Sequence, residues 1–273
     1  MAPVVAAVLP HPPLLVPELA GAAAAELDPL RTACREALAT VMAATDHTVL
    51  VGDGPVWGVP EPSAPGSFAP YGVDLRVTLP TLTDLHPAAP SARTQPTAPT
   101  PGRKSDRPEL PVPARLPELP LSLAVAAHLL AGLDAAPARL SAVTVPTSLG
   151  PGAAAAIGRG LTAAARSGPA GDGPVGLVVM ADLSACRTER APGAFRAEAA
   201  DFDASVAEAL RTGKPTRLLD LDPALAADLM VAGRVPLQVL AGAFESEPAA
   251  GGRVLYEDAP YGVGYLVAVL TAP

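Results

Sequence analysis

The stretch Val175-Gly176-Leu177-Val178-Val179-Met180 is apolar or small at every position and is followed by Ala181-Asp182. A short run of this kind, rich in valine, is typical of a strand that is buried on both faces of a sheet. Such strands belong to parallel sheets, in which the connecting helices cover both faces. The stretch therefore predicts a central strand of an α/β sheet, with Asp182 in the loop at its end.

Further strands are expected on both sides of this one in the sequence. The run 4–9 is closed by Pro10-His11-Pro12-Pro13, and the run 48–51 is closed by Gly52-Asp53-Gly54-Pro55. Each combination predicts a buried strand that ends in a rigid or tight loop. Apolar and polar residues alternate over 73–79, which indicates a half-buried strand. The remaining strands are expected at 142–145, 254–256 and 263–270.

Segments with helical spacing of apolar residues separate these strands. They cover 26–44, 121–133, 153–165, 203–210, 223–231 and 235–244. Asp203 is the expected N-cap of its helix. Because strands and helices alternate along the chain, we expect a single α/β domain over residues 1–273. Its central sheet should be mixed but mostly parallel, with helices on both faces.

Residues 80–117 break this alternation. Proline recurs every few residues among Thr, Ser, Arg and Ala, and no apolar periodicity survives. A segment of this composition buries too little apolar surface to offset the entropy lost on ordering. We therefore expect an exposed and disordered insertion.

Composition narrows the class of protein. The formal net charge is −8 and no Lys/Arg cluster occurs, so binding to the phosphates of nucleic acids is not expected. The first residues lack the basic region of a secretory signal, and the apolar runs are too short to span a membrane. Two cysteines, Cys34 and Cys186, are too few for a disulfide framework or a structural zinc site. The cytoplasm is the expected location.

Polar residues follow several of the predicted strands, at His11, Asp53, Thr147 and Asp182. Parallel strands deliver their carboxyl ends to one edge of a sheet, where open α/β sheets place their sites. We therefore expect a pocket at this edge, made of His11, Asp53, Asp182, Ser184 and Cys186, with His11 within about 10 Å of Asp53 and Ser184. The other histidines, His47, His86 and His128, should lie outside it.

Each of these residues also has a simpler interpretation. His11 could cap its turn, and Gly-Asp-Gly-Pro is ordinary turn chemistry for Asp53. Cys186, close to Arg187 and Arg190, could have a depressed pKa and react, or it could simply pack at the start of a loop. Those arginines could anchor an anion or pair with Glu189 on the surface. Trp57 fits the wall of a pocket and the core equally well. Gly52-x-Gly54 lacks the third glycine of a dinucleotide fingerprint.

Several stretches together resemble a known family, the catalytic B subunit of class III extradiol ring-opening dioxygenases, with the related Memo-like proteins. The stretches are 7–17 (AVLPHPPLLVP), the strand ending at Gly52, 180–185 (MADLSA), 236–243 (PLQVLAGA) and 261–265 (YGVGY). Residues 187–193, with the pattern Arg-Thr-Glu-x-Ala-Pro-Gly, are similar to an actinobacterial branch of this family. The resemblance covers nearly the whole chain apart from the proline-rich segment.

Active members of that family use non-haem Fe(II), held by histidines and a carboxylate or a further histidine, with another histidine as acid/base. The resemblance places the first ligand at His11. The second ligand position falls in the Asp53 loop, where Asp53 is the only substitute for a histidine. The acid/base position is Ala185, and the last ligand position is Gly233. His11 with Asp53 is too small a ligand set to retain iron.

Three functions remain open on this basis. The first is a dioxygenase-like protein without a complete Fe(II) site, and so without a cofactor, that binds a small molecule or a protein partner. The second is an active extradiol dioxygenase with Fe(II) on atypical ligands. The third is a thiol enzyme or hydrolase built around Cys186 and Asp182. The sequence leaves the ligand, the partner and the oligomeric state open.

Overall fold

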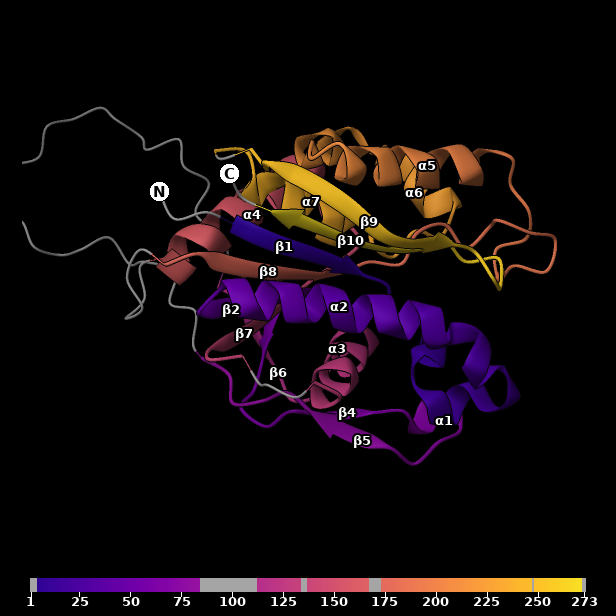
Figure 1. Cartoon of the computed structure of the whole chain (residues 1–273), viewed down its shortest axis with the longest axis horizontal. Coiled ribbons are helices and arrows are strands. Elements are labelled where there is room, and N and C mark those ends of the chain that lie inside the picture. The colour runs from indigo at the N-terminus through magenta and orange to yellow at the C-terminus, as the bar shows by residue number, and fades with distance from the viewer. Residues whose placement is uncertain (1–3, 84–111, 134–136, 167–172, 247, 272–273) are drawn as a thin grey trace, which may run out of the picture.

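The apolar runs form an eight-stranded sheet with the order β6-β3-β7-β2-β8-β1-β10-β9 (Figure 1). The structure is a computed structural model, and it describes residues 4–83, 112–133, 137–166, 173–246 and 248–271. The strands of the sheet are β1 (Val4–Leu9), β2 (His47–Asp53), β3 (Gly58–Pro60), β6 (Ala114–Leu116), β7 (Leu140–Val145), β8 (Val175–Met180), β9 (Gly251–Asp258) and β10 (Tyr265–Thr271). A separate two-stranded sheet pairs β4 (Pro65–Ser67) with β5 (Arg76–Thr78).

The four central strands, β7, β2, β8 and β1, are parallel to their neighbours within this group. Strand β8, whose sequence predicts a central strand, lies between β2 and β1 and is buried along its whole length. Antiparallel strands complete the sheet: β10 pairs with β1, and β9 pairs with β10. At the other edge β3 is antiparallel to β7 and parallel to β6. The fold is therefore mixed α/β with a mostly parallel sheet.

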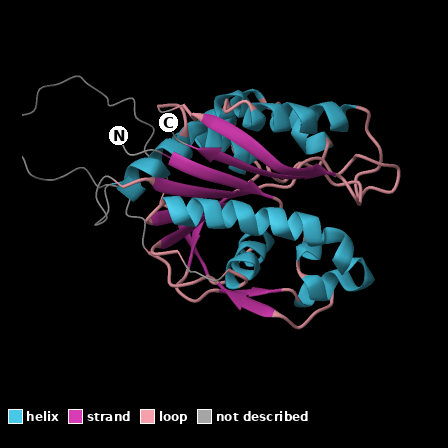
Figure 2. Ribbon diagram, in the orientation of Figure 1, coloured by secondary structure: helices cyan, strands magenta, loops and turns pink. Residues whose placement is uncertain are grey.

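Helices cover both faces of the sheet (Figures 1 and 2). One face carries α2 (Asp28–Ala44) and α3 (Leu121–Ala131); the other carries α4 (Pro151–Arg166), α5 (Glu198–Arg211), α6 (Pro223–Asp228) and α7 (Arg234–Ala243). Shorter helical segments are η1 (Pro13–Leu15), α1 (Pro17–Ala20), η2 (Gly21–Leu27), η3 (Ala69–Tyr71) and η4 (Pro215–Asp220). Successive side chains of β1 enter opposite cores, Val4, Ala6 and Val8 on the α4–α7 face and Val5, Ala7 and Leu9 on the α2–α3 face. This explains why the buried strands are apolar at every position.

The order of the strands reverses at the centre of the sheet. From β1 the chain runs through α2 to β2 and through α3 to β7, and then returns through α4 to place β8 between β1 and β2. The return helix lies on the opposite face, as right-handed crossovers require when the direction of travel changes. The loops after β1, β2 and β8 consequently meet at one edge of the sheet, at a point where open α/β sheets form sites.

Most expected elements are found within a few residues of their predicted bounds, and three expectations need correction. Asp203 is not an N-cap, because α5 begins at Glu198 and Asp203 is buried within the helix. Of the alternating stretch 73–79, only Arg76–Thr78 is a strand. The ends of the expected insertion 80–117 are ordered: Leu82 bridges to Leu140, and β6 pairs with β3. Residues 84–111, the remainder of that expected insertion, lie outside the described residues.

Among the described residues, none of the helices combines the length and the apolar character needed to cross a membrane.

Candidate functional site

His11 lies at the carboxyl edge of the sheet between two aspartates. Its backbone N–H donates a hydrogen bond to Oδ1 of Asp182 at 2.8 Å. Its imidazole Nε2 is 3.1 Å from Oδ1 of Asp53 and 3.9 Å from Oδ2 of Asp182. The three side chains come from the loops or ends of neighbouring strands, in the order Asp53 on β2, Asp182 after β8 and His11 after β1. The convergence that the sequence predicts for these residues is therefore found.

The local sequence holds each member of this cluster in place. Pro10 and Pro12 flank His11 and restrict the backbone on both sides of it. Asp53 is the last residue of β2, and its backbone carbonyl accepts a hydrogen bond of 2.7 Å from the hydroxyl of Ser122 in the first turn of α3. Asp182 is two residues beyond the end of β8, a strand buried along its whole length. The cluster is thus anchored by elements of the core.

The electrostatics favour a protonated imidazole at His11. Burial alone would lower the pKa of His11, but the carboxylates of Asp182 and Asp53 overcome it and raise this pKa to about 9. Burial alone would raise the pKa of Asp53. The hydrogen bond and the charge of His11 outweigh this effect, so the pKa of Asp53 is lowered. Burial raises the pKa of Asp182 despite the nearby imidazole. The contacts with the two carboxyl groups therefore favour the protonated form of the His11 imidazole.

The exposed parts of this cluster are its carboxyl groups. The side chain of His11 is only 5% exposed, whereas those of Asp53 and Asp182 are 27% and 17% exposed. A molecule that approaches the edge would meet carboxylate oxygens first, and these accept hydrogen bonds. In addition, Nδ1 of His11 is buried and has no hydrogen-bond partner among the described residues. A buried polar atom normally has a hydrogen-bond partner, and none of the described residues supplies one to this nitrogen.

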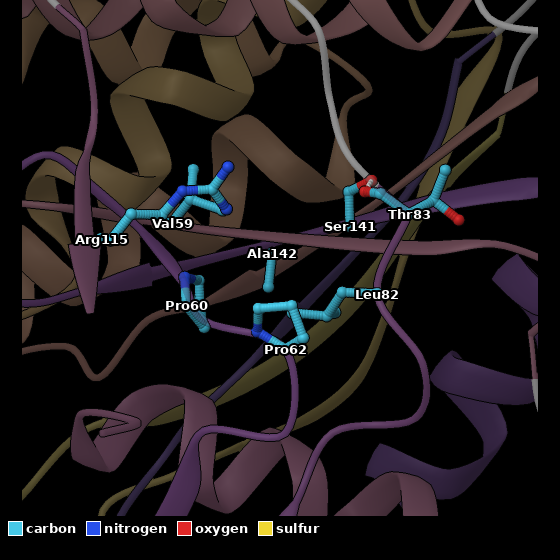
Figure 3. A pocket seen from close by; sticks show the side chains of 8 residues that line it. All are labelled: Val59, Pro60, Pro62, Leu82, Thr83, Arg115, Ser141 and Ala142. Atoms are coloured by element: carbon cyan, nitrogen blue, oxygen red, sulfur yellow. Dashed lines mark hydrogen bonds between the residues drawn. The ribbon is translucent and has the colours of Figure 1, made fainter. Parts of the chain in front are cut away.

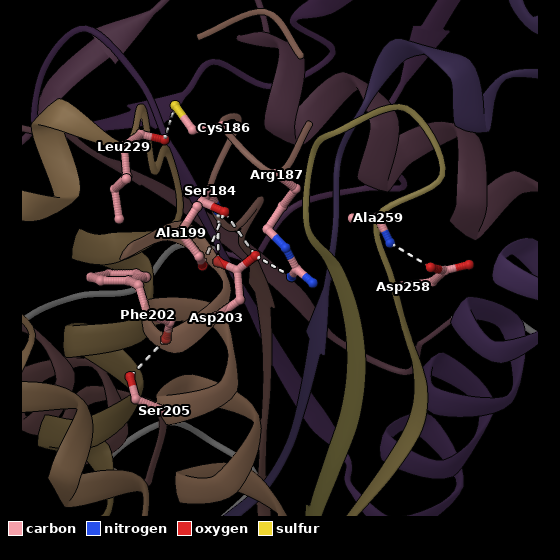
Figure 4. Close-up of polar contacts among 10 residues, drawn as sticks. All are labelled: Ser184, Cys186, Arg187, Ala199, Phe202, Asp203, Ser205, Leu229, Asp258 and Ala259. Carbon is pink, nitrogen blue, oxygen red and sulfur yellow. Dashed lines mark hydrogen bonds and ion pairs between the residues drawn. The ribbon is translucent and has the colours of Figure 1, made fainter. Parts of the chain in front are cut away.

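Ser184, the next expected pocket residue, takes part in a hydrogen-bond network around Asp203 (Figure 4). The carboxylate of Asp203 accepts hydrogen bonds from the backbone N–H of Ser184 at 2.9 Å, from the hydroxyl of Ser184 at 2.8 Å and from Nη1 of Arg187 at 2.9 Å. Burial raises the pKa of Asp203, although these donors work against the shift. The network fixes the loop after β8 onto α5, and both donors of Ser184 are engaged there with Asp203.

Sequence reasoning misses Asp203 as a site-supporting residue. The signal is present, because Asp203 shares the buried stripe of α5 with Ala199, Phe202 and Val206 at helical spacing. An acid on the buried face of an amphipathic helix needs hydrogen-bond donors, and the loop 184–187 supplies them.

The comparisons with known proteins bear on the fold. No family model matches the chain, and no curated protein sequence matches it. Among solved structures, the chain is similar to the crystal structure of uncharacterized protein JW3007 from Escherichia coli K12, with a TM-score of 0.51 and 13% sequence identity. The match covers 98% of this chain and 100% of that one. At this identity the likeness concerns the overall fold alone.

Cys186 is buried and lies against backbone carbonyl groups, which agrees with the simpler interpretation of a residue packed at the start of a loop (Figure 4). Its Sγ is 3.5 Å from the carbonyl oxygen of Gly193 and 3.6 Å from that of Leu229. Burial raises the pKa of the Cys186 thiol, and Arg196 offsets this only in part. Arg187 pairs with Asp203. Glu189, which the sequence offers as a surface partner for the arginines, and Arg190 are both exposed. Trp57 is partly buried and packs against the core.

Two of the remaining histidines lie elsewhere, as predicted. His47 is the first residue of β2, at the opposite end from Asp53, and its Nε2 is 2.8 Å from the hydroxyl of Ser141. Ser141 lines a small cavity of about 50 Å³ there (Figure 3). His128 is on α3 and packs edge to face with Phe68 at 6.3 Å between ring centroids. His86 lies outside the described residues.

The residues present do not fit the iron site that the resemblance implies. A Cβ atom added at Gly233 would lie 2.6 Å from Cβ of Ala181 and 2.7 Å from the carbonyl oxygen of Asp182, so a ligand side chain there would require the backbone to move. Ala185 carries no acid/base group, and its N–H donates to the carbonyl of Leu229. Within the described ranges, no group of three or more His, Cys, Asp or Glu side chains is arranged to hold a metal ion.

Proposed function

We propose that this chain is a small-molecule-binding protein on a frame that resembles the B subunit of class III extradiol dioxygenases, without that family's iron chemistry. The observation that carries the proposal is the placement of His11 between Asp53 and Asp182. Gly233 and Ala185, the other positions that the resemblance implies, carry no metal ligand and no acid/base group.

The ligand class follows from the groups that the cluster exposes. Asp53 and Asp182 present acceptors, and the buried imidazolium of His11 keeps their combined charge low. Hydroxyl groups are suitable donors for such a site, and a diol can engage two carboxylates at once. We therefore infer a ligand with two or more adjacent hydroxyl groups. The alternative of a thiol enzyme built around Cys186 is less well supported, because this thiol is buried and burial raises its pKa.

Metal content and catechol binding test the proposal together. Protein purified anaerobically should contain iron far below one equivalent per chain, and protocatechuate should give no oxygen uptake. Catechol, used as a probe with two adjacent hydroxyl groups, should shift the imidazole signals of His11 in an NMR titration. Asp53→Asn should weaken this binding, because it removes a charged acceptor. Glu61→Gln, on an exposed residue in the loop that follows β3, is the matched control.

Two outcomes would overturn the proposal. Stoichiometric iron that is lost in His11→Gln, with oxygen uptake on protocatechuate, would establish the active dioxygenase instead. Absence of any catechol-dependent shift at His11 would show that the cluster is not a site for such ligands.

A further inference from the structure

A second candidate site lies beside the His11 cluster, in an open hollow of about 320 Å³. It is lined by Thr147, Pro223, Ala226, Ala227, Met230, Val231, Ala232 and Arg234. These residues come from the loop after β7, from α6 and the segment after it, and from the first residue of α7. The volume falls in the range of small-molecule pockets, which are mostly apolar with a few polar groups.

Arg234 is the only charged residue of this hollow, and it is 5% exposed. Its Nη1 donates to Oε1 of Gln238 at 2.8 Å, and its Nη2 donates to the backbone carbonyl of Thr147. Both acceptors are neutral. Among the described residues, no carboxylate lies within ion-pair distance of this guanidinium, whereas Arg187 pairs with Asp203. Burial accordingly lowers the pKa of Arg234.

A buried charge without a counter-ion is costly, and an anion placed in the hollow would supply the missing charge. A guanidinium has five N–H donors in a planar fork, so the two bonds already made leave donors for an incoming carboxylate. The amino-terminal end of α7 adds a partial positive charge on the same side.

We propose that this hollow binds a small organic carboxylate, with the carboxylate on Arg234 and the apolar body against Ala226, Val231 and Met230. A single positive charge matches a monoanion better than a phosphate dianion. Met230 is 53% exposed at the rim, and its flexible side chain can adapt to the apolar body. The site is distinct from the His11 cluster, although the two are neighbours: the N–H of Gly233 donates to the backbone carbonyl of Asp182 at 2.9 Å.

Benzoate and its neutral analogue benzamide test this proposal by isothermal titration calorimetry on the full chain. Benzoate should bind the wild-type protein and benzamide should not. Arg234→Met should weaken benzoate binding by about tenfold or more, because a charged hydrogen bond is lost. Ala227→Phe should abolish binding, since Ala227 is exposed and lines the hollow, so the larger side chain would fill it. Ala224→Phe, exposed on the same helix but outside the lining, is the matched control and should bind as the wild type does.

If Arg234→Met fails to fold, the comparison of Ala227→Phe with Ala224→Phe still tests whether the hollow binds benzoate. The proposal is overturned if benzoate does not bind the wild type, if benzamide binds as well as benzoate does, or if Ala227→Phe and Ala224→Phe bind it equally. Catechol is absent from this experiment, so its result is independent of the one at His11.

Discussion

Asp203 illustrates how one buried acid can organise a loop. Three donors from Ser184 and Arg187 converge on its carboxylate, and Arg187 reaches it from a partly exposed position. The loop 183–187 begins directly after Asp182. The contacts of this loop with Asp203 therefore help to hold Asp182 beside His11.

Replacing Asp203 by Ala should therefore destabilise the fold. The variant leaves the buried backbone N–H of Ser184 and the guanidinium of Arg187 without their acceptor, and it leaves the Ser184 hydroxyl only the carbonyl oxygen of Ala199 at 3.5 Å. The expected cost is about 3 kcal/mol in the free energy of unfolding. Urea denaturation measures this. Asp201→Ala, on an exposed position of the same helix, should change the free energy of unfolding by less than about 0.5 kcal/mol. Equal effects of the two variants would contradict the assigned network.

The two cysteines should be unreactive in the native protein. Both are buried, and burial raises the pKa of Cys34 to about 12 and raises that of Cys186. A thiol-specific reagent such as DTNB should label neither within minutes at pH 8 and both in denaturant, because the thiolate is the reactive form. Rapid native labelling of Cys186 would revive the thiol-enzyme interpretation.

Among the helices, α4 and α7 touch backbone to backbone. The faces in contact carry Gly158 on α4 and Gly242 on α7. A Cβ atom at Gly158 would collide with the carbonyl oxygen of Val239 on α7. A Cβ atom at Gly242 would collide with the carbonyl oxygen of Ala155 on α4. These two helices form much of the cover over one face of the sheet, and α7 begins directly after Gly233.

Gly158→Ala should force these helices apart and lower the free energy of unfolding by about 1 to 3 kcal/mol. Gly152→Ala is the matched control in the first turn of the same helix, where nothing lies within 4 Å of the added atom. It should leave stability unchanged or raise it, since alanine favours the helix by up to about 1 kcal/mol. A loss of stability in the control similar to that of Gly158→Ala would contradict the close contact.

The sequence predicts strands better than it predicts where polar side chains point. Fully apolar runs such as 175–180 indicate a buried strand, and the loops after such strands share an edge once the strands are parallel. The preference of acids for helix caps predicts a helix start at Asp203, yet its tertiary contact with Ser184 decides its role. Strand β6 has no periodicity of its own over Ala114–Leu116 and is held by pairing with β3, so no local pattern predicts it. The hollow at Arg234 likewise depends on the spacing between α6 and α7, which no local pattern encodes.

For the molecule as a whole, the reversal of strand order brings three titratable groups into one place and links stability to pH. The folded pKa of His11 is above its unfolded value of about 6.5, so its contribution to stability is fully present below pH 6.5 and is lost as the pH rises through about 9. The contribution is on the order of 3 kcal/mol.

Urea denaturation between pH 6 and 10 should therefore show the free energy of unfolding of the wild type falling across this window. His11→Gln should start lower and show a flatter profile, because the titrating group is absent. Identical slopes for the two proteins would mean that the ion pairs of His11 do not contribute to the folded state.

The protonation of His11 between its two aspartates can be measured by NMR titration of protein with ¹³C,¹⁵N-labelled histidine. We expect an imidazole pKa near 9 for His11, well above those of His47 and His128, whose pKa values burial lowers. Asp53→Asn should lower the pKa of His11 by about one unit or more. A His11 pKa at or below about 6.5, unchanged in Asp53→Asn, would contradict the conclusion that two carboxylates hold a proton at this edge of the sheet.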